Sequence, residues 1–327
     1  MADAQHRVKS GNGNGLVAIL GAGSLGRLWG ALLPKGTTAF IPRRHAPDEY
    51  EPDLTYRFQD GHGHYYPITV PSLDWSAQSP DTLIVTTKAG DTLGALETTL
   101  PNLKPTVPVV LFQNGMGSQQ AVAERWPNRP IMAASTTEGA NRPDSQTTVH
   151  AGQGETWIGA LTHSAPSLVT SVVNQLKTSG LIIHEEPNIL ERLWGKLIIN
   201  AGINPYTAIL DCANGDILDA PLFRDTIRQL CLELADVMHH EGLSSRSPED
   251  MESQIEAVAR KTAKNTSSMC SDVRRGKPTE IDYINGYIVS RAGAHNLAVP
   301  VNQMLTEQVK LRTDTQQEPQ PDTPGAT

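Results

Sequence analysis

The sequence has few of the features that mark secreted, membrane-spanning or nucleic-acid-binding proteins. It has only three cysteines, and no two of them have CxxC spacing. An odd number of cysteines without this spacing favours free thiols in a reducing compartment over disulfides or a metal site. No apolar run approaches the roughly 20 residues of a membrane-spanning helix. The formal net charge of -8 gives no support to nucleic-acid binding, although an anionic ligand needs only a local basic site. We expect a cytoplasmic protein that binds no metal.

The length of 327 residues predicts two domains, because single hydrophobic cores seldom grow so large. Hydrophobic residues make up 38% of the chain and the mean hydropathy is -0.33, which is typical of globular proteins. Residues 1–15 are polar, lack the apolar core of a signal peptide and are predicted to be a flexible leader. Residues 313–327 are rich in Pro, Gln, Asp and Thr and are predicted to be a disordered tail.

Strand-length apolar runs alternate with helical patterns in the first part of the chain, and helical patterns alone follow. The predicted strands are 16–20, 37–41, 81–87, 107–112, 130–135, 147–158 (more than one) and 181–185. The predicted helices include 167–179 and then 188–204, 221–241, 249–273 and 280–295. We therefore predict an α/β domain over 16–186 and an all-α domain over 187–312. Residues 46–80 look irregular, and His62 and His64 indicate a hairpin or loop there more than a metal site.

The first predicted strand runs directly into the glycine pattern Gly21-Ala22-Gly23-Ser24-Leu25-Gly26, and a helical pattern follows. In this setting Gly21 allows a tight turn, Gly23 lets a pyrophosphate approach the backbone, and Gly26 lets the helix pack on the strand. The free N–H groups of the helix N-terminus suit the phosphates. The pattern predicts dinucleotide binding, with a merely structural glycine turn as the alternative.

Basic and amide side chains follow three of the predicted strands. Arg43 and Arg44 stand where NAD enzymes usually carry an acidic residue, which favours the 2′-phosphate of NADP(H) unless they are ordinary surface arginines. Lys88 lies in a loop at the carboxyl end of a predicted strand, where such sheets bind ligands. Asn114 follows the next strand and is able both to donate and to accept hydrogen bonds, although Asn-Gly is also a common turn.

The apolar segment 188–204 carries three polar side chains four residues apart, Lys196, Asn200 and Asn204, which share nearly one helix face. Such groups are costly in an apolar interior without partners, so the face either lines a polar pocket or is solvated. Pro205 predicts that the helix bends or ends at Asn204.

Further along, one predicted helix contains both Asn265 and Ser268. Glu280 is predicted in the first turn of the last long helix, behind a Thr279–Asp282 capping box. Simple complementation of the helix dipole is the alternative role of Glu280.

Taken together, these residues resemble the ketopantoate reductase (2-dehydropantoate 2-reductase) family, and the resemblance covers roughly residues 16–310. The motifs that carry the resemblance are Gly-Ala-Gly-Ser-Leu-Gly at 21–26, Thr-Lys-Ala at 87–89, Gln-Asn-Gly-Met-Gly at 113–117, Trp-Gly-Lys-Leu-Ile-Ile-Asn-Ala-Gly-Ile-Asn-Pro at 194–205, Asn-Thr-Ser-Ser-Met at 265–269 and Gly-Lys-Pro-Thr-Glu-Ile-Asp-Tyr-Ile-Asn-Gly at 276–286. The segment 45–75 and the two ends fit the family poorly.

The resemblance implies a Rossmann domain joined to a helical domain like that of 6-phosphogluconate dehydrogenase. It also implies NADPH-dependent reduction of ketopantoate to pantoate, a step of pantothenate and coenzyme A biosynthesis. The positions that match the family's catalytic residues are Lys196, Glu280 and Asn114. Those that match its substrate-binding residues are Asn114, Lys196, Asn200, Asn204, Asn265 and Ser268. Those that match its cofactor contacts are Gly21, Ala22, Gly23, Ser24, Leu25, Gly26, Arg43 or Arg44, Lys88 and Asn114.

Two other functions stay open at the level of sequence. One is reduction of a different 2-oxo acid, since one or two pocket side chains decide such specificity. The other is a non-catalytic NADP-binding sensor, against which the presence of Lys196, Asn114 and Glu280 together argues. We expect a small-molecule partner and no membrane or nucleic-acid partner, and the sequence leaves a homodimer open.

Overall fold

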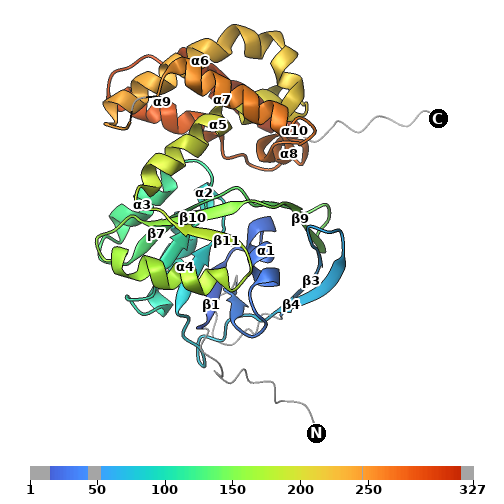
Figure 1. Cartoon of the computed structure of the whole chain (residues 1–327), viewed down its shortest axis with the longest axis vertical. Helices are drawn as coiled ribbons and strands as arrows, with labels where there is room; N and C mark the ends of the chain where they lie inside the picture. Colours follow the sequence, from blue (N-terminus) through green and yellow to red (C-terminus); the bar gives the residue numbers. More distant parts are fainter. Residues whose placement is uncertain (1–14, 43–52, 245, 318–327) are drawn as a thin grey trace, which may run out of the picture. The chain divides into compact units, whose positions relative to one another are not determined.

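The computed structural model describes residues 15–42, 53–244 and 246–317, and these fold into two compact units (Figure 1). The first unit comprises the described residues up to 113 together with 118–189. The second comprises the described residues from 190 onwards, together with the short segment 114–117, which follows a strand of the first unit in the chain.

A seven-stranded sheet forms the centre of the first unit. Its strands, in spatial order, are β11 (Ile182–Glu185), β10 (Glu155–Ala160), β7 (Ile131–Thr136), β6 (Val109–Leu111), β5 (Thr82–Val85), β1 (Val17–Leu20) and β2 (Thr38–Phe40). Neighbouring strands are parallel except β10 and β7. The helices of this unit are α1 (Ser24–Leu32), α2 (Ala89–Thr99), α3 (Ser118–Arg125) and α4 (Val169–Lys177), with short 3₁₀ turns η1 (Leu100–Asn102) and η2 (Pro166–Leu168).

The two faces of this sheet support separate hydrophobic cores, which explains the unbroken apolar runs of its strands. Val17 and Ile19 of β1 point into one core with Leu28 of α1. Ala18 and Leu20 point into the other, with Leu96 of α2. Because side chains alternate along a strand, a strand covered on both faces must be apolar at every position. This arrangement confirms the predicted Rossmann-type class.

A second sheet of four strands occupies part of the segment that looked irregular. Its order is β4 (Tyr65–Val70), β3 (Leu54–Gln59), β9 (Thr147–Gly152) and β8 (Gly139–Asn141). β3 and β4 form a hairpin whose turn contains His62 and His64, and both of their backbone N–H groups donate to the Asp60 carboxylate at 2.9 Å. The prediction that the two histidines lie in a hairpin or loop is confirmed. The prediction that residues 54–70 are irregular was wrong, because Pro and charged residues interrupt the strand pattern there.

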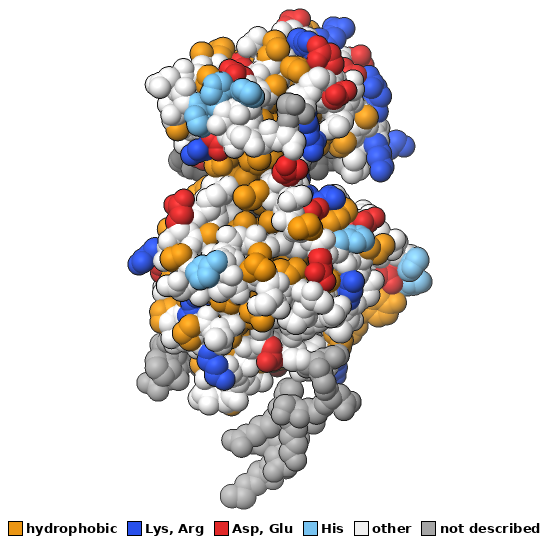
Figure 2. Space-filling model, turned by 60° about the vertical axis from the view of Figure 1, so that its left-hand side comes forward, with side chains coloured by type: hydrophobic (Ala, Val, Ile, Leu, Met, Phe, Trp, Pro, Cys, Tyr) orange, Lys and Arg blue, Asp and Glu red, His pale blue; other side chains and the backbone are white. Residues whose placement is uncertain are grey.

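Helices make up the second unit, as predicted. They are α5 (Ile189–Leu210), α6 (Pro221–His240), α7 (Pro248–Lys261), α8 (Ser268–Arg274), α9 (Asn285–Ala294) and α10 (Pro300–Gln317), with 3₁₀ turns η3 (Asn214–Asp219) and η4 (Ile281–Tyr283). None of the helices in the described ranges is long and apolar enough to cross a membrane. On the face drawn in Figure 2, charged side chains of both signs are interspersed over this unit.

Four details of the helical prediction were wrong. Helix α5 continues through Pro205 to Leu210, past the predicted boundary at residue 204, so of the two expectations for Pro205 the helix end is excluded. The predicted helix 249–273 is two helices, because Ser267 caps a new one by accepting from the Cys270 N–H at 3.0 Å. Glu280 precedes a 3₁₀ turn and not a long helix, and Thr279 Oγ1 accepts from the Ile281 N–H, not that of Asp282. The last long helix is α10, which was missed and which extends into the predicted tail as far as Gln317.

The N-terminus of α10 is held by a buried carboxylate from α6. Glu233 is 3% exposed and accepts hydrogen bonds from the N–H groups of Val301 and Asn302 at 2.9 and 3.0 Å. It also accepts from the side-chain amide of Asn302 at 2.8 Å. An anion at this place satisfies N–H groups that have no partner within the helix, and the helix dipole favours its charge.

We predict that Glu233→Ala lowers the free energy of unfolding by about 2 kcal/mol or more, because it leaves buried N–H groups without an acceptor. Urea unfolding followed by circular dichroism measures the loss. Asp236→Ala, on the same helix but exposed, is the matched control and is expected to cost less than about 0.5 kcal/mol. Equal losses of unfolding free energy in the two variants would show that the Glu233 hydrogen bonds stabilise the fold no more than an exposed carboxylate does.

Candidate functional site

The glycine loop between β1 and α1 has the backbone geometry that its sequence predicts. Gly21 has a φ of +106°, a conformation that L side chains rarely adopt, and a Cβ there would lie 2.8 Å from the Thr87 nitrogen. A Cβ on Gly26 would lie 2.0 Å from the Gly21 carbonyl oxygen. Both positions therefore require glycine for reasons internal to the fold.

Gly23 differs, because the nearest atom to a Cβ built there is the Thr86 carbonyl oxygen at 4.0 Å. The protein's own packing thus leaves this place open, as expected if a ligand approaches the backbone. Gly23 precedes α1 without a side-chain cap, and the first turn of α1 carries no acidic residue. Together with half-buried Ala22, Ser24 and Leu25, these features fit a phosphate group of a dinucleotide.

Two supports of the loop were missed from the sequence. Arg27 of α1 is 7% exposed; its Nε donates to the Ala22 carbonyl at 3.2 Å, and one of its terminal nitrogens donates to the Ser145 carbonyl at 2.8 Å. Thr86 Oγ1 donates to the Gly21 carbonyl at 2.7 Å. Their hydrogen bonds to backbone carbonyls, which no sequence motif reveals, identify them as holding the loop in shape.

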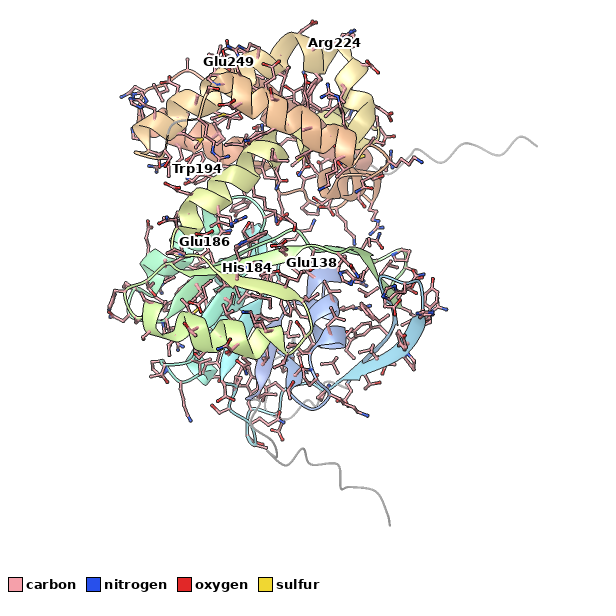
Figure 3. The ribbon with its side chains drawn as sticks, viewed as in Figure 1. Glu138, His184, Glu186, Trp194, Arg224 and Glu249 are labelled. Carbon is pink, nitrogen blue, oxygen red and sulfur yellow. The ribbon has the colours of Figure 1, made fainter. Side chains whose placement is uncertain are left out.

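Of the other predicted cofactor residues of the first unit, the structure describes Lys88. Lys88 stands at the N-terminus of α2 with a half-buried side chain. Arg43 and Arg44 lie outside the described residues. Glu138, labelled in Figure 3, follows β7 and is paired with His150 at 2.6 Å in a buried contact that the sequence did not predict. It stands at the carboxyl edge of the parallel strands, the edge to which the glycine loop also belongs.

In the helical unit the structure brings together three predicted residues from distant parts of the chain. Lys196 Nζ donates to Asn114 Oδ1 at 2.8 Å, and Asn114 Nδ2 donates to Glu280 Oε2 at 3.4 Å. Lysine is a donor only and an ionised carboxylate an acceptor only, so the orientation of the amide between them is determined. Burial lowers the pKa of Lys196 to about 8, and the nearby Glu280 carboxylate acts in the opposite direction.

The segment 114–117 belongs to the helical unit because two tyrosines hold it. The Met116 N–H donates to the Tyr283 carbonyl at 2.8 Å, and a Cβ on Gly115 would lie 2.1 Å from that carbonyl oxygen. A Cβ on Gly117 would lie 3.1 Å from the Tyr287 ring. The Tyr287 ring lies 5.7 Å, between centroids, from that of Trp194 on α5, which Figure 3 labels. The glycines around Asn114 are thus explained by close packing, a role that the sequence alone did not reveal.

The remaining predicted substrate residues are placed by α5 and by the loop between α7 and α8. Asn200 and Asn204 follow Lys196 along the unbroken α5, where Asn204 is 8% exposed and not on a solvated face. Asn265 is exposed in the loop, and exposed Ser268 begins α8. A buried hydrogen bond of 2.7 Å between Thr207 Oγ1 of α5 and Ser267 Oγ connects the two places.

A doubly wound sheet with this glycine loop, together with a lysine of lowered pKa in the helical unit, defines a dinucleotide-dependent oxidoreductase. The particular family follows from comparison with known proteins. The family model described as "Ketopantoate reductase PanE/ApbA" matches residues 17–163, and "Ketopantoate reductase PanE/ApbA C terminal" matches residues 188–313. The chain belongs to the ketopantoate reductase family.

Individual relatives agree with this assignment. The chain is 34% identical to a 2-dehydropantoate 2-reductase of Shigella flexneri, covering 90% of this chain and 94% of the relative. It is 33% identical to one of Vibrio cholerae, with 90% and 96% covered. A PanE/ApbA family ketopantoate reductase structure from Ralstonia eutropha is 27% identical, with 92% and 99% covered and a TM-score of 0.79. A dimeric ketopantoate reductase from Staphylococcus aureus is 24% identical, with the same coverage and a TM-score of 0.77.

The contact geometry predicts that Glu280→Gln lowers the pKa of Lys196 below its value of about 8, because the carboxylate no longer favours the ammonium. The pH dependence of Lys196 labelling by an amine reagent, read by mass spectrometry, measures this pKa. Asp282→Asn, two residues away and exposed, is the matched control and should leave it unchanged. A Lys196 pKa that stays at about 8 or rises in Glu280→Gln would contradict the electrostatic role of Glu280.

Proposed function

We propose that this protein reduces ketopantoate to pantoate with NADPH. The observation that carries the proposal is the hydrogen-bonded chain from Lys196 through Asn114 to Glu280, with a lysine pKa of about 8. Membership of the ketopantoate reductase family supports the same reaction. A lysine with this pKa is still mostly protonated at neutral pH and releases its proton far more readily than an ordinary lysine, as a general acid must.

The residues present fit NADP(H). We assign the pyrophosphate to the loop 21–26 and the N-terminus of α1, and the further phosphate to Arg43 or Arg44, with Lys88 as an additional contact. When bound there, the cofactor would supply the hydride that the substrate carbonyl carbon accepts. In this assignment residues 16–186 are the NADP-binding domain and residues 187–312 the substrate domain.

The side chains of the helical unit handle the proton and the substrate. Lys196 holds a proton on Nζ and transfers it to the carbonyl oxygen as negative charge develops there. Asn114 orients that ammonium through Oδ1, and Glu280 keeps it protonated at neutral pH. The donors that we assign to the substrate's carboxylate and hydroxyl groups are Asn200, Asn204, Asn265 and Ser268.

The three cysteines are free, which supports a reducing compartment such as the cytoplasm. A homodimer is the assembly to test first, since the Staphylococcus aureus protein of the same fold is described as dimeric. Sedimentation velocity over a range of concentrations decides this, and a monomer throughout would refute the dimer.

We predict that the protein oxidises NADPH with ketopantoate faster than with other 2-oxo acids, and that it binds NADPH at least about tenfold more tightly than NADH. Absorbance at 340 nm across a panel of 2-oxo acids measures the first, and fluorescence titration the second. Ala at both 43 and 44 is expected to remove most of the cofactor preference. If another 2-oxo acid were reduced faster, that acid would replace ketopantoate in the proposal. If the protein bound NADPH but reduced none of the acids, the non-catalytic NADP-binding sensor would be favoured.

We predict that Lys196→Ala lowers kcat by about 10²–10⁴, the loss typical of a missing general acid, while NADPH affinity changes little. In the unmodified enzyme, reduction is expected to slow as pH rises above about 8, because Lys196 loses its proton; in the variant this decline disappears. Pre-steady-state hydride transfer measures the step, and circular dichroism checks folding. Lys261→Ala, at an exposed lysine, is the control. A folded Lys196→Ala enzyme that transfers hydride at the parent rate would falsify the acid role.

A further inference from the structure

Pro205 creates a local problem inside α5. In an α-helix the carbonyl of residue i accepts from the N–H of residue i+4, but proline has no N–H. The Ala201 carbonyl therefore cannot receive its usual hydrogen bond. Ala201 is fully buried, so leaving this oxygen without a donor is costly. The affected turn is bounded by Asn200 and Asn204, the two asparagines that we assign to the substrate.

A side chain from α9 supplies the missing donor. Asn285 is fully buried, and its Nδ2 donates to the Ala201 carbonyl oxygen at 3.3 Å. The second hydrogen of the same amide is directed to Asn302 Oδ1 at 3.1 Å. Asn285 thus connects the proline turn of α5 to the N-terminus of α10.

The orientation of Asn285 is set from a distance by Glu233. Because the Glu233 carboxylate accepts from Asn302 Nδ2, Asn302 must present Oδ1 to Asn285. Asn285 must then present Nδ2, and its own Oδ1 is buried without a hydrogen-bond partner in the described part of the chain. An unsatisfied buried acceptor is costly. Asn285 therefore contributes through the two hydrogen bonds that its nitrogen donates and not through its oxygen.

We propose that Asn285 is a positioning residue for substrate binding: it holds the Ala201–Pro205 turn of α5 so that Asn200 and Asn204 present their amides in the binding orientation. This inference rests on the proposed function, because it takes the two asparagines as substrate contacts. Lys196 is oriented separately, by its hydrogen bond to Asn114. Loss of Asn285 therefore affects substrate affinity before it affects the proton transfer.

The first test compares Asn285→Ala and Asn285→Asp with the unmodified enzyme. Both variants remove the donor, and Asp keeps the shape. Both are expected to raise KM for ketopantoate by between about tenfold and a hundredfold, the range for misplaced contact groups, with kcat and NADPH affinity within about twofold. Calorimetric titration of pantoate into the NADP⁺-bound protein is expected to show the same loss. Ile288→Val, which removes buried volume from the same helix, is the control for general destabilisation and should leave KM unchanged.

The second test restores the missing hydrogen bond by another route. Pro205→Ala gives residue 205 an N–H that can donate to the Ala201 carbonyl, which makes Asn285 unnecessary at that place. The double variant Asn285→Ala/Pro205→Ala is therefore expected to bind ketopantoate within about threefold of Pro205→Ala alone, and this non-additivity is the signature of the proposed contact.

The outcomes separate this inference from the proposed function. An unmodified enzyme that does not reduce ketopantoate refutes the proposed function. An active enzyme whose KM is unchanged in Asn285→Ala, or rises equally in Ile288→Val, overturns the positioning role. A KM increase that persists in full on the Pro205→Ala background also overturns it, because the Ala201 carbonyl would then not be the atom through which Asn285 acts.

Discussion

The partial burial of the Lys196 ammonium is the constraint on which much of the helical unit depends. A buried cation is costly without partners, and here an amide oxygen at 2.8 Å and a carboxylate beyond it supply them. Burial and the carboxylate have opposite effects on the lysine pKa, and the balance brings it to about 8. Without the carboxylate the pKa of this lysine would be lower still, whereas a lysine in water has a higher pKa and releases its proton less readily.

This constraint explains why four residues that follow a strand of the first unit are packed into the second. Asn114 must reach Lys196, so the chain around it lies close to the helices. Gly115 allows this, since any side chain would collide with the Tyr283 carbonyl. At the preceding position Gln113 is held in the first unit, where its Nε2 donates to the Val85 and Thr87 carbonyls at 3.0 and 3.2 Å. The change of unit therefore takes place across a single peptide bond.

The sequence predicted the fold class and the glycine loop well, because both depend on local patterns: apolar runs of strand length and glycines at set spacings. Lys196 was identifiable from its four-residue spacing with Asn200 on an apolar helix. That Asn114, 82 positions away, belongs to the same site followed only from the family resemblance, and the hydrogen bond between the two was not predicted, since no local pattern encodes such a pairing. The continuation of α5 through Pro205 was missed for a related reason: the donor that compensates the proline comes from another helix.

Asn114 and Asn285 have different roles, but both depend on the hydrogen bonds of a side-chain amide. Each amide lies between a group that fixes its orientation and a group that needs a particular partner. Asn114 offers its oxygen to a donor-only lysine and its nitrogen to a carboxylate. Asn285 offers both hydrogens, to a helix carbonyl and to an amide whose direction Glu233 determines. A carboxylate in place of Asn114 would still attract the lysine but repel Glu280, whereas one in place of Asn285 would have no hydrogen to give either neighbour. Asparagine is suited to both positions because its two ends are chemically distinct and uncharged, so a buried helical unit can transmit orientation over several residues without adding a further charge.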